Sequence, residues 1–479
     1  MPLILPGNVG SATAATGYNV ANSCMFNDGD SAYMHRTPSA GNRRTMTLSV
    51  WIKGSSLADG TNNILGQYNS SNENNSMLLT IEGAGKIMVW NYTTDAYTMD
   101  IRTNRLLRDN SAWYHIVVAV DTTQATASNR VKVYVNGVQE TSLAVASYPS
   151  ENLELFLNQN VAQNIGTQRF GSTVSAPFDG YMAEFCFIDG TQNAVTDFGE
   201  FDEDSGIWKP INVSGLTFGT NGYYLDFEDS SALGNDVSGN DNDFTTVNLA
   251  ATDQSTDTCT NNFCTWNILD SFYSSATFSE GNTTVVTPNA SLTYATGTVG
   301  LSSGRWYFEV QPFDPSDDNN IGIVDHVSTS NGGSAGELQF QPRGYAYRQV
   351  GDVYNNNSSV SGSWAAYSAG VTIGVFVDLE DNKIYWSRNG VMQNSGTGVA
   401  ITASASTDTG FYFPAVGDYV TNDDTTFRTN FGGSSSFAIS SGVTDDNGYG
   451  TFEYTPSVTV DSTAKKFYAI CTKNLAEYG

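Results

Sequence analysis

Positive charge is scarce in this sequence. Its 479 residues include 21 Lys and Arg against 49 Asp and Glu, which gives a net charge of −28 at pH 7. The acidic excess is spread over both halves of the chain. Because such a surface repels the phosphates of nucleic acids and of anionic lipids, the sequence predicts that the protein binds neither nucleic acid nor a membrane surface.

Long apolar runs and a secretory leader are also missing. No apolar stretch approaches the roughly 20 residues that a membrane-spanning helix needs. The first residues, Met-Pro-Leu-Ile-Leu-Pro-Gly, lack the basic region of a signal peptide and are interrupted by Pro6 and Gly7. We therefore expect synthesis in a reducing cytoplasm, no membrane insertion, and release by a route other than secretion.

Residues for metal binding and acid–base catalysis are few. The three histidines are His35, His115 and His326. His115 lies in an apolar stretch, so we expect it in the core. Cys186 has apolar neighbours and is expected to be a buried thiol. The spacing of Cys259 and Cys264 does not fit a zinc site, and either a local disulfide or two free thiols agrees with the sequence. No nucleophile elbow, phosphate loop or dinucleotide fingerprint is present.

Glycine, serine, threonine and asparagine are abundant, and aromatic residues make up 12% of the chain. This mixture of strand formers and turn formers predicts an all-β protein. Residues 46–52 alternate with period two, which places on one face Met46, Leu48, Val50 and Ile52. Asn136 and Gly137 predict a type I′ hairpin turn. Four tryptophans in apolar strands are expected in the core: Trp51, Trp113, Trp306 and Trp386.

Four segments of the first half follow one another in a characteristic order: Leu48-Ser-Val-Trp-Ile52, Trp113-Tyr-His-Ile-Val117, Val133-Tyr-Val-Asn-Gly137 and Phe178-Asp-Gly-Tyr-Met-Ala-Glu184. Together they resemble the laminin-G/concanavalin-A-like lectin sandwich. The resemblance covers roughly residues 23–190 and implies a sandwich of two antiparallel sheets. The motifs are moderately specific as a set and weak singly.

The second half carries five ordered segments: Gly304-Arg-Trp-Tyr-Phe-Glu309, Ile321-Gly-Ile323, Ile373-Gly-Val-Phe-Val-Asp378, Trp386-Ser-Arg-Asn-Gly-Val391 and Phe413-Pro-Ala-Val416. They resemble the SPRY domain, which is another bent β-sandwich. This resemblance spans residues 270–435. It implies a partner-binding surface made of loops, and Asn389 with Gly390 predicts a second tight hairpin.

The fold class that follows is all-β, with two consecutive antiparallel, jelly-roll-like β-sandwiches. Residues 1–22 are predicted to form an extended arm, because they contain few large apolar residues. A laminin-G-like sandwich over 23–190, an acidic connecting region over 191–265 and a SPRY-like sandwich over 266–479 follow. Residues 223–227 alternate, which fits a strand that returns to the first sandwich.

Glycoside hydrolysis is the enzymatic alternative, since some concanavalin-A-like folds are glucanases. That chemistry needs two carboxylates facing one cleft. Residues 200–204, Glu-Phe-Asp-Glu-Asp, have the spacing of such a pair. They depart from the glucanase pattern, because Glu203 stands where an apolar residue is expected and Asp204 where a glutamate is expected. A solvated acidic loop explains them better, and we predict that the protein is not an enzyme.

Calcium is the one cofactor that the sequence suggests. Residues 236–243 gather oxygen-bearing side chains around a glycine, and the candidate ligands are Asp236, Asn240, Asp241 and Asp243. The spacing is not that of an EF-hand loop. A metal-free loop closed by Asx turns is the alternative interpretation.

Tyrosines concentrate in the polar stretch 343–368, which we predict to be a loop recognition surface. The candidate ligand-binding residues are Arg343, Tyr345, Tyr347, Arg348, Tyr354, Trp364 and Tyr367. Aromatic rings offer rigid stacking faces, and two arginines in a chain with few basic residues suit an anionic glycan. Packing of the loop base and a subunit contact are the alternatives.

Several stretches most closely resemble structural proteins of marine tailed bacteriophages: residues 26–33, 37–44, 187–191 and 198–208. This resemblance implies a capsid or tail fibre or decoration protein on the virion surface, which binds a host surface glycan or protein. We expect a homo-oligomer, with a trimer favoured, whose arm contacts other virion proteins. A secreted bacterial lectin or adhesin and a glycan-degrading enzyme are the alternatives.

Overall fold

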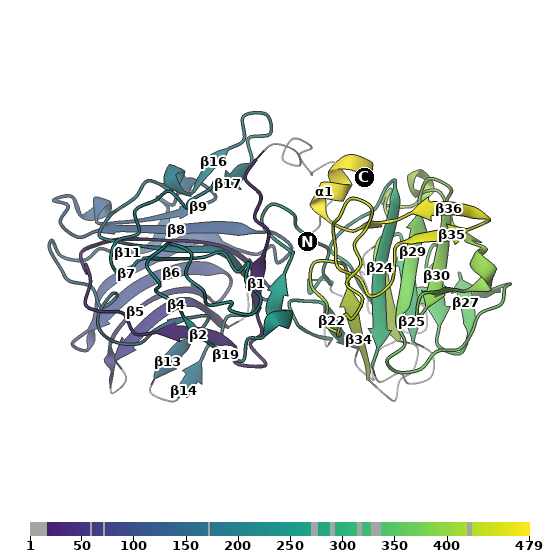
Figure 1. Cartoon of the computed structure of the whole chain (residues 1–479), viewed down its shortest axis with the longest axis horizontal. Helices are drawn as coiled ribbons and strands as arrows, with labels where there is room; N and C mark the ends of the chain where they lie inside the picture. Colours follow the sequence, from purple (N-terminus) through teal and green to yellow (C-terminus); the bar gives the residue numbers. More distant parts are fainter. Residues whose placement is uncertain are drawn as a thin grey trace. The chain divides into compact units, whose positions relative to one another are not determined.

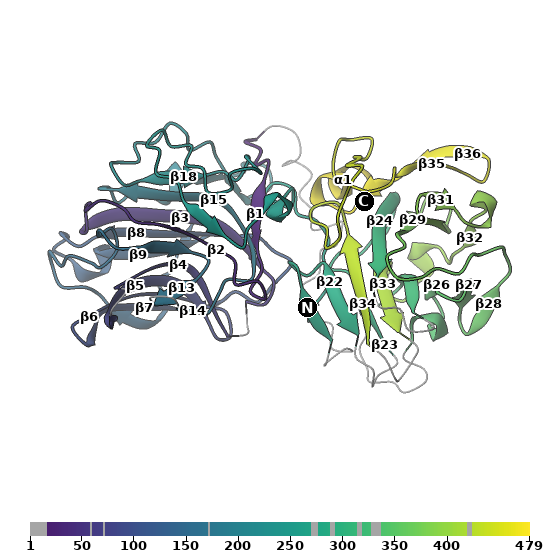
Figure 2. The ribbon, with the colours of Figure 1, turned by 60° about the horizontal axis from the view of Figure 1, so that its bottom comes forward.

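The computed structural model describes residues 17–57, 60–69, 72–170, 173–269, 276–287, 293–313, 319–326, 337–418 and 424–479. These residues form two compact units whose boundary in the sequence lies between Thr260 and Asn261. We call them the N-terminal unit and the C-terminal unit, and Figures 1 and 2 show the strands of each. No helix in the described ranges is long and apolar enough to span a bilayer.

Two eight-stranded sheets form the N-terminal unit, and Figure 2 shows them as two layers. The β3 sheet contains, in order, β10 (Val138–Gln139), β9 (Val131–Val135), β8 (Tyr114–Asp121), β3 (Thr45–Gly54), β15 (Gly180–Asp189), β1 (Ser23–Phe26) and β20 (Gln254–Ser255), with β18 (Tyr223–Leu225) paired to β15. The β5 sheet contains β11 (Leu143–Ser147), β7 (Ala96–Leu106), β6 (Lys86–Thr93), β5 (Asn72–Glu82), β4 (Thr61–Asn69), β12 (Gln163–Ile165), β2 (Tyr33–Arg36) and β19 (Thr245–Val247). Two hairpins, β13 (Gln168–Phe170) with β14 (Thr173–Ser175) and β16 (Gly199–Phe201) with β17 (Trp208–Pro210), complete the unit.

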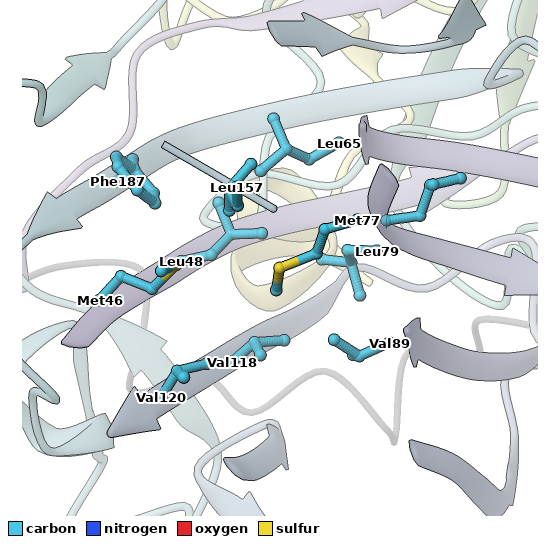
Figure 3. A pocket seen from close by; sticks show the side chains of 11 residues that line it. Met46, Leu48, Leu65, Met77, Leu79, Val89, Val118, Val120, Leu157 and Phe187 are labelled. Carbon is cyan, nitrogen blue, oxygen red and sulfur yellow. The ribbon is translucent and has the colours of Figure 1, made fainter. Parts of the chain in front are cut away.

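The core of the N-terminal unit lies between these sheets, as the alternation in the sequence predicts. Four side chains of β3 are at most 4% exposed and contribute to it: Met46, Leu48, Val50 and Ile52. This core contains a cavity of about 20 Å³. Figure 3 shows side chains that line it, among them Leu48, Met77 and Phe187. Its walls are hydrocarbon and thioether groups, so the cavity is a feature of core packing with no polar group to bind a ligand.

The outer face of the β3 sheet is covered by the segment that follows β15. His115 on β8 is 1% exposed and lies between the rings of Trp51, 4.7 Å away, and Trp208, 6.0 Å away. Its Nδ1 accepts a hydrogen bond from Trp208 Nε1 at 2.9 Å, and its Nε2 lies 2.8 Å from Ser49 Oγ. Burial lowers the pKa of His115 to about 3, so the ring is neutral. The prediction of a core histidine is confirmed.

The predicted connecting region over 191–265 differs from the structure. Residues 191–260 belong to the N-terminal unit, because β18, β19 and β20 extend its two sheets and Trp208 covers its outer face. The return of residues 223–227 to the first sandwich is observed as β18. Many of the turn-forming residues therefore connect short strands of one unit, and no separate linker of this length exists between residues 191 and 260.

The arm predicted over residues 1–22 falls largely outside the described residues, which begin at 17. Within 17–22, the expected lack of a core does not hold. Val20 is 3% exposed and packs with Trp51 and Trp113. Its backbone N–H donates to Thr260 Oγ1 at 3.1 Å. Residues 17–22 therefore pack onto the N-terminal unit itself.

The C-terminal unit contains two further sheets (Figure 1). The β24 sheet contains β21 (Thr277–Ser279), β22 (Thr284–Thr287), β34 (Thr425–Asn430), β24 (Arg305–Pro312), β29 (Ile373–Asp378), β30 (Lys383–Arg388) and β31 (Val391–Met392), with β32 (Val399–Ala400) paired to β30 and β37 (Tyr468–Ala469) to β24. The β25 sheet contains β23 (Thr293–Thr296), β33 (Phe413–Asp418), β25 (Asn320–Val324), β26 (Tyr345–Arg348), β27 (Asp352–Asn355) and β28 (Ser358–Val360). A hairpin of β35 (Ser457–Val460) and β36 (Thr463–Lys466) precedes α1 (Thr472–Tyr478).

Local predictions about tryptophans and turns are confirmed. The four tryptophans of the apolar strands are 0–8% exposed: Trp51, Trp113, Trp306 and Trp386. Asn136 and Gly137 have φ angles of 47° and 78°, and Asn389 and Gly390 have 45° and 75°. Positive φ at both positions is what a type I′ turn requires, and Asn-Gly adopts it with little strain.

The local disulfide that the sequence left open is not formed. All five cysteines are free thiols. Cys186 is 1% exposed, as expected, and burial raises its pKa. Cys264 lies in the core of the C-terminal unit, whereas Cys259 packs against a cluster of the N-terminal unit. Cys259 and Cys264 thus pack in different hydrophobic clusters. This explains why they form no disulfide although they are five residues apart in the sequence.

A buried carboxyl group on β15 makes stability depend on pH. Glu184 is 5% exposed, and its Oε2 accepts a hydrogen bond of 2.8 Å from Tyr224 OH. Burial raises its pKa to about 7 from the ordinary 4.5. The folded protein therefore keeps this proton up to about pH 7, whereas the unfolded chain releases it near pH 4.5.

We expect the free energy of unfolding to fall as pH rises from 4.5 to 7, by about 3 kcal/mol from this group. Glu184→Gln should remove that fall. Denaturant unfolding at a series of pH values measures the difference, with Glu203→Gln on the exposed β16–β17 hairpin as control. An unchanged pH slope in Glu184→Gln would show that another group is responsible.

Candidate functional site

The tyrosines predicted to form a recognition loop are core residues instead. Tyr345 and Tyr347 lie on β26 and are 5% and 0% exposed, and Tyr367 is 3% exposed. The hydroxyl of Tyr367 donates to Asn319 Oδ1 at 2.8 Å. Because these rings fill the interior of the C-terminal unit, they present no face to a ligand. Their period-two spacing at 345 and 347 was the sign of a strand that turns both rings to the same face.

The other residues of that prediction are half-buried and bound to protein groups. Arg343 Nη1 pairs with Asp325 at 3.2 Å and with Asp408 at 2.8 Å. The Arg348 guanidinium lies 4.7 Å from the ring centre of Tyr354, on the neighbouring strand β27. Trp364 packs against Trp386, with ring centres 5.7 Å apart. Arg343 and Arg348 therefore do not form a shared binding site for an anion. Of the predicted residues, Arg348 and Tyr354 do lie together.

The candidate calcium loop is closed by its own hydrogen bonds. Asp236 Oδ1 accepts from the backbone N–H groups of Tyr224 and Ser238, and Oδ2 accepts from Ser238 Oγ and Asn242 N, at 2.8–2.9 Å. These four bonds use the lone pairs of both oxygens. Asp243 Oδ1 accepts from Asp236 N at 2.9 Å, and Asn240 Nδ2 donates to the carbonyls of Gly219 and Gly222.

These residues therefore do not fit a calcium ion, and the Asx-turn interpretation describes the loop. Asp236, Asn240, Asp241 and Asp243 are thus corrected from metal ligands to loop-closing residues. Asp241 has φ 54°, a left-handed conformation that Asp tolerates in turns. Within the described ranges, no group of three or more His, Cys, Asp or Glu side chains is arranged to hold a metal ion.

An aromatic platform lies on the outer face of the β5 sheet. It consists of Tyr68 on β4, Trp90 and Tyr92 on β6, and Tyr97 on β7. Trp90 is its centre, with ring centres 6.5 Å from Tyr68, 6.4 Å from Tyr92 and 5.7 Å from Tyr97. All three pairs are edge-to-face, the arrangement that aromatic quadrupoles favour. Tyr68 is buried, Trp90 and Tyr92 are half-buried, and Tyr97 is 52% exposed.

Two backbone features assemble this platform. On β6, Val89 points into the core, so Trp90 and Tyr92 alternate onto the opposite face as the strand period requires. Tyr97 has the same parity as the core residue Met99, and strict alternation would direct it inward. A β-bulge between β6 and β7 shifts the register there and pairs Tyr97 with Tyr92.

A glycine provides the space for the buried ring of the platform. Gly66 precedes Tyr68 by two residues on β4 and lies on the same face. A Cβ atom at residue 66 would stand 2.8 Å from Cε2 of Tyr68, which is too close for a real contact. The missing side chain therefore lets the Tyr68 ring lie flat over the strand and support Trp90.

Charged side chains stand beside the rings. Asp100 on β7 is directly opposite Trp90, and it forms a bidentate pair with Arg102 at 2.9 and 3.1 Å. Arg102 Nη1 also pairs with Glu82 at 3.2 Å. The hydrogen bonds of Asp100 raise the pKa of Arg102, so the guanidinium stays charged. The site thus offers apolar ring faces next to fixed donors and acceptors.

This arrangement suits binding rather than hydrolysis. Sugar rings stack on aromatic faces through their C–H groups, while hydroxyls accept and donate hydrogen bonds to charged side chains. Two carboxylates beside the platform, Asp100 and Glu82, are both bound to Arg102. The acidic stretch 200–204 lies on the exposed β16–β17 hairpin, where a backbone hydrogen bond from Ser205 lowers the pKa of Asp202 to about 2. That shift is opposite to what a general acid needs.

The sequence analysis did not select these platform residues. The alternation around Trp90 and Tyr92 was a usable signal, because it assigns both rings to the face opposite Val89. The bulge that brings Tyr97 onto the same face has no comparable signature in the sequence.

Comparison with known proteins supports the fold of the N-terminal unit. A family model described as the concanavalin A-like lectin/glucanases superfamily matches residues 27–194. The N-terminal unit therefore has a concanavalin A-like lectin fold. A search of curated proteins found no match.

Several solved structures are similar to this chain at low identity. The SPRY domain of human HERC1 is 13% identical, with 34% of this chain and 96% of that chain covered and a TM-score of 0.26. A putative carbohydrate binding protein from Bacteroides ovatus is 16% identical, with 48% and 58% covered and a TM-score of 0.33. The CBM40 of a Ruminococcus gnavus sialidase, solved with α2,3-sialyllactose, is 14% identical, with 34% and 91% covered and a TM-score of 0.25.

Proposed function

We propose that this protein is a non-enzymatic, carbohydrate-binding protein that holds a glycan against the aromatic platform of its N-terminal unit. The observation that carries the proposal is the gathering of Trp90, Tyr92 and Tyr97 on the outer face of a lectin-type sheet. Of the tyrosines in the described part of the chain, Tyr97 is the most exposed. A contiguous exposed aromatic cluster on a sheet face is typical of an interaction site.

The platform is rigid, which favours binding. Trp90 is held from one side by buried Tyr68 and from the other by Tyr92 and Tyr97. The strands β5 and β7 pair on both edges of β6, so the backbone under Trp90 cannot shift easily. Little conformational entropy is then lost when a ligand binds, and more of the stacking energy appears as affinity.

Trp90→Ala should weaken glycan binding by about 10- to 100-fold, the loss typical of a central aromatic anchor. A glycan array on the full chain would identify the ligand, and titration calorimetry with that glycan would give the affinity of the variant. Phe201→Ala is the matched control, since Phe201 is a 50% exposed ring of the same unit on the β16–β17 hairpin. Equal affinities for Trp90→Ala and the unaltered protein would remove the platform from consideration.

Absence of catalysis is part of the proposal. The support is chemical, because Arg102 engages Asp100 and Glu82 beside the platform, and an ion-paired carboxylate is a poor proton donor. Incubation of the protein with the glycan identified on the array, followed by analysis of reducing ends, tests this point. Release of shorter saccharides that is lost in Asp100→Asn would establish a hydrolase instead.

We further propose that the protein is a virion surface component, a fibre or decoration protein of a capsid or tail. The resemblance of residues 26–33, 37–44, 187–191 and 198–208 to bacteriophage structural proteins supports this. The part of the predicted arm that precedes residue 17 would then contact other virion proteins, a homotrimer would display the sandwiches, and the ligand would be a host surface glycan or protein. A density map of the assembled particle in which both units can be fitted would locate the protein. Absence of the protein from purified particles would refute the proposal.

A further inference from the structure

A second polar site lies in the C-terminal unit, on the face of the β24 sheet opposite its main core. It is an open hollow of about 530 Å³ whose charged lining comes from Arg305, Asp381, Lys383, Asp461 and Lys465. Three of the 21 basic residues of the chain meet here. The aromatic platform does not account for them, because it lies in the other unit.

Strand pairing builds the floor of the hollow. Arg305 on β24, Asp378 on β29 and Lys383 on β30 are cross-strand neighbours in one row. They share a face because Trp306, Val377 and Ile384, one position along each strand, point into the core. Charges of alternating sign are thus fixed side by side on three adjacent strands. The labels β24, β29 and β30 in Figure 1 mark this part of the sheet.

The β35–β36 hairpin supplies the opposite wall. Lys465 Nζ binds Asp378 at 2.8 Å, Asp381 at 2.6 Å and Tyr385 OH at 3.2 Å, so its three donors are used. Asp461 Oδ2 accepts from Lys383 Nζ at 2.6 Å and from Tyr385 OH at 2.8 Å. These bonds clamp the hairpin over the row and hold the hollow open.

Other hydrogen-bonding groups of the hollow are not used up by this network. Arg305 pairs with Asp378 through Nε and with Glu380 through Nη2. Its third nitrogen, Nη1, makes no ion pair with the described residues. Lys383 uses one of its three donors, on Asp461. Asp381 binds Lys465 through Oδ2 alone and is 53% exposed. Donors and an acceptor therefore face the same space.

We propose that this hollow is a second ligand site, specific for a neutral, hydroxyl-rich molecule such as a hexose unit. Each sugar hydroxyl both donates and accepts, which matches the mixture of free donors on Arg305 and Lys383 and the free acceptor on Asp381. The cations Arg305, Lys383 and Lys465 are nearly balanced by the carboxylates of Asp378, Glu380, Asp381 and Asp461. With no excess positive charge, the hollow has no preference for an anionic ligand. This site is independent of the aromatic platform.

The test uses the full chain carrying Trp90→Ala, so that the platform does not contribute. Ligand-observed NMR with glucose, galactose, mannose and N-acetylglucosamine would detect binding, and we expect at least one of these hexoses to bind. In that background, Lys383→Met should weaken the binding at least about tenfold, because it removes charged donors but keeps the aliphatic stem. Lys466→Met is the matched control, since Lys466 is the neighbour of Lys465 on β36 but pairs outward with Asp446.

A second variant covers the case in which loss of Lys383 disturbs the hairpin. Ala464 lines the hollow and is exposed, so Ala464→Trp should fill the space and abolish binding while every ion pair stays in place. If none of the four hexoses binds, the proposal is overturned. Unchanged binding in both Lys383→Met and Ala464→Trp would do so as well. Preference for glucuronate over glucose, weakened by salt, would show an oxyanion site instead.

Discussion

Replacing Lys53 with methionine is expected to destabilise the N-terminal unit by about 3–5 kcal/mol, the usual result of breaking a buried ion pair. Lys53 Nζ lies 2.7 Å from Asp257 Oδ2, and the two side chains are only 2% and 1% exposed. The other carboxylate oxygen accepts from Trp113 Nε1 at 3.0 Å. Without Lys53, the Asp257 charge stays in a low-dielectric interior with no cation to offset its lost hydration.

Hydrogen exchange of the β3 and β15 amides in the full chain would measure this loss within the unit concerned. The double variant Lys53→Met/Asp257→Asn should recover much of it, because asparagine carries no charge and still accepts from Trp113. Arg44→Ala is the matched control. Arg44 pairs with Glu154 at the surface, where such a pair contributes less than about 1 kcal/mol. A double variant less stable than the single one would contradict the explanation.

Trp386→Ala should cost the C-terminal unit about 3–5 kcal/mol, as expected for deletion of a large ring from a packed core. Trp386 is 1% exposed, and its ring centre lies 6.1 Å from Tyr347 and 5.7 Å from Trp364. Its Nε1 donates to the Ile321 carbonyl at 3.1 Å, so the change also leaves that buried oxygen with one partner fewer.

Hydrogen exchange of the β29 and β30 amides would report this destabilisation. Trp386→Phe should cost clearly less, because it keeps most of the buried ring area and loses chiefly the indole hydrogen bond. Val391→Ala, at a 67% exposed position on β31, should change stability by no more than about 0.5 kcal/mol. If Trp386→Ala were as mild as Val391→Ala, the position of Trp386 at the centre of the core would be wrong.

Both proposed sites use the same structural solution. In each unit, one face of a sheet is fixed by the core, and the ligand-binding groups stand on the other face of that sheet. Trp90 and Tyr92 alternate with core residue Val89, and Arg305 and Lys383 alternate with Trp306 and Ile384. The rigidity that gives large losses on core substitution is therefore also what positions the binding groups before the ligand arrives.

The sequence by itself determined the class of fold and the local turns. Period-two alternation assigned the side chains of residues 46–52 to their faces, since strand geometry allows no other arrangement. Asn136 with Gly137 and Asn389 with Gly390 specified hairpin turns, because few other residues adopt positive φ twice in succession. These properties depend on neighbours a few residues apart.

Burial of aromatic residues, in contrast, depended on the tertiary structure. Residues 343–368 looked like a recognition loop because their tyrosines lie among polar residues. In the structure, β26 pairs with both β25 and β27, and Tyr345 and Tyr347 turn into the interior. Tyrosines among polar residues occur both in buried strands and in binding loops. The sequence does not distinguish the two cases, because the order of the strands in the sheet decides which residues are covered.

The two proposed sites and the buried ion pair could be found only in the folded chain. Lys53 and Asp257 are 204 residues apart, and Lys465 and Asp378 are 87 apart. Strict alternation along β7 would turn Tyr97 toward the core. The β-bulge between β6 and β7 places it instead on the outer face, beside Trp90. Charges and rings act over a few ångströms, so their partners are decided by sheet order, register and bulges, which connect segments distant along the chain.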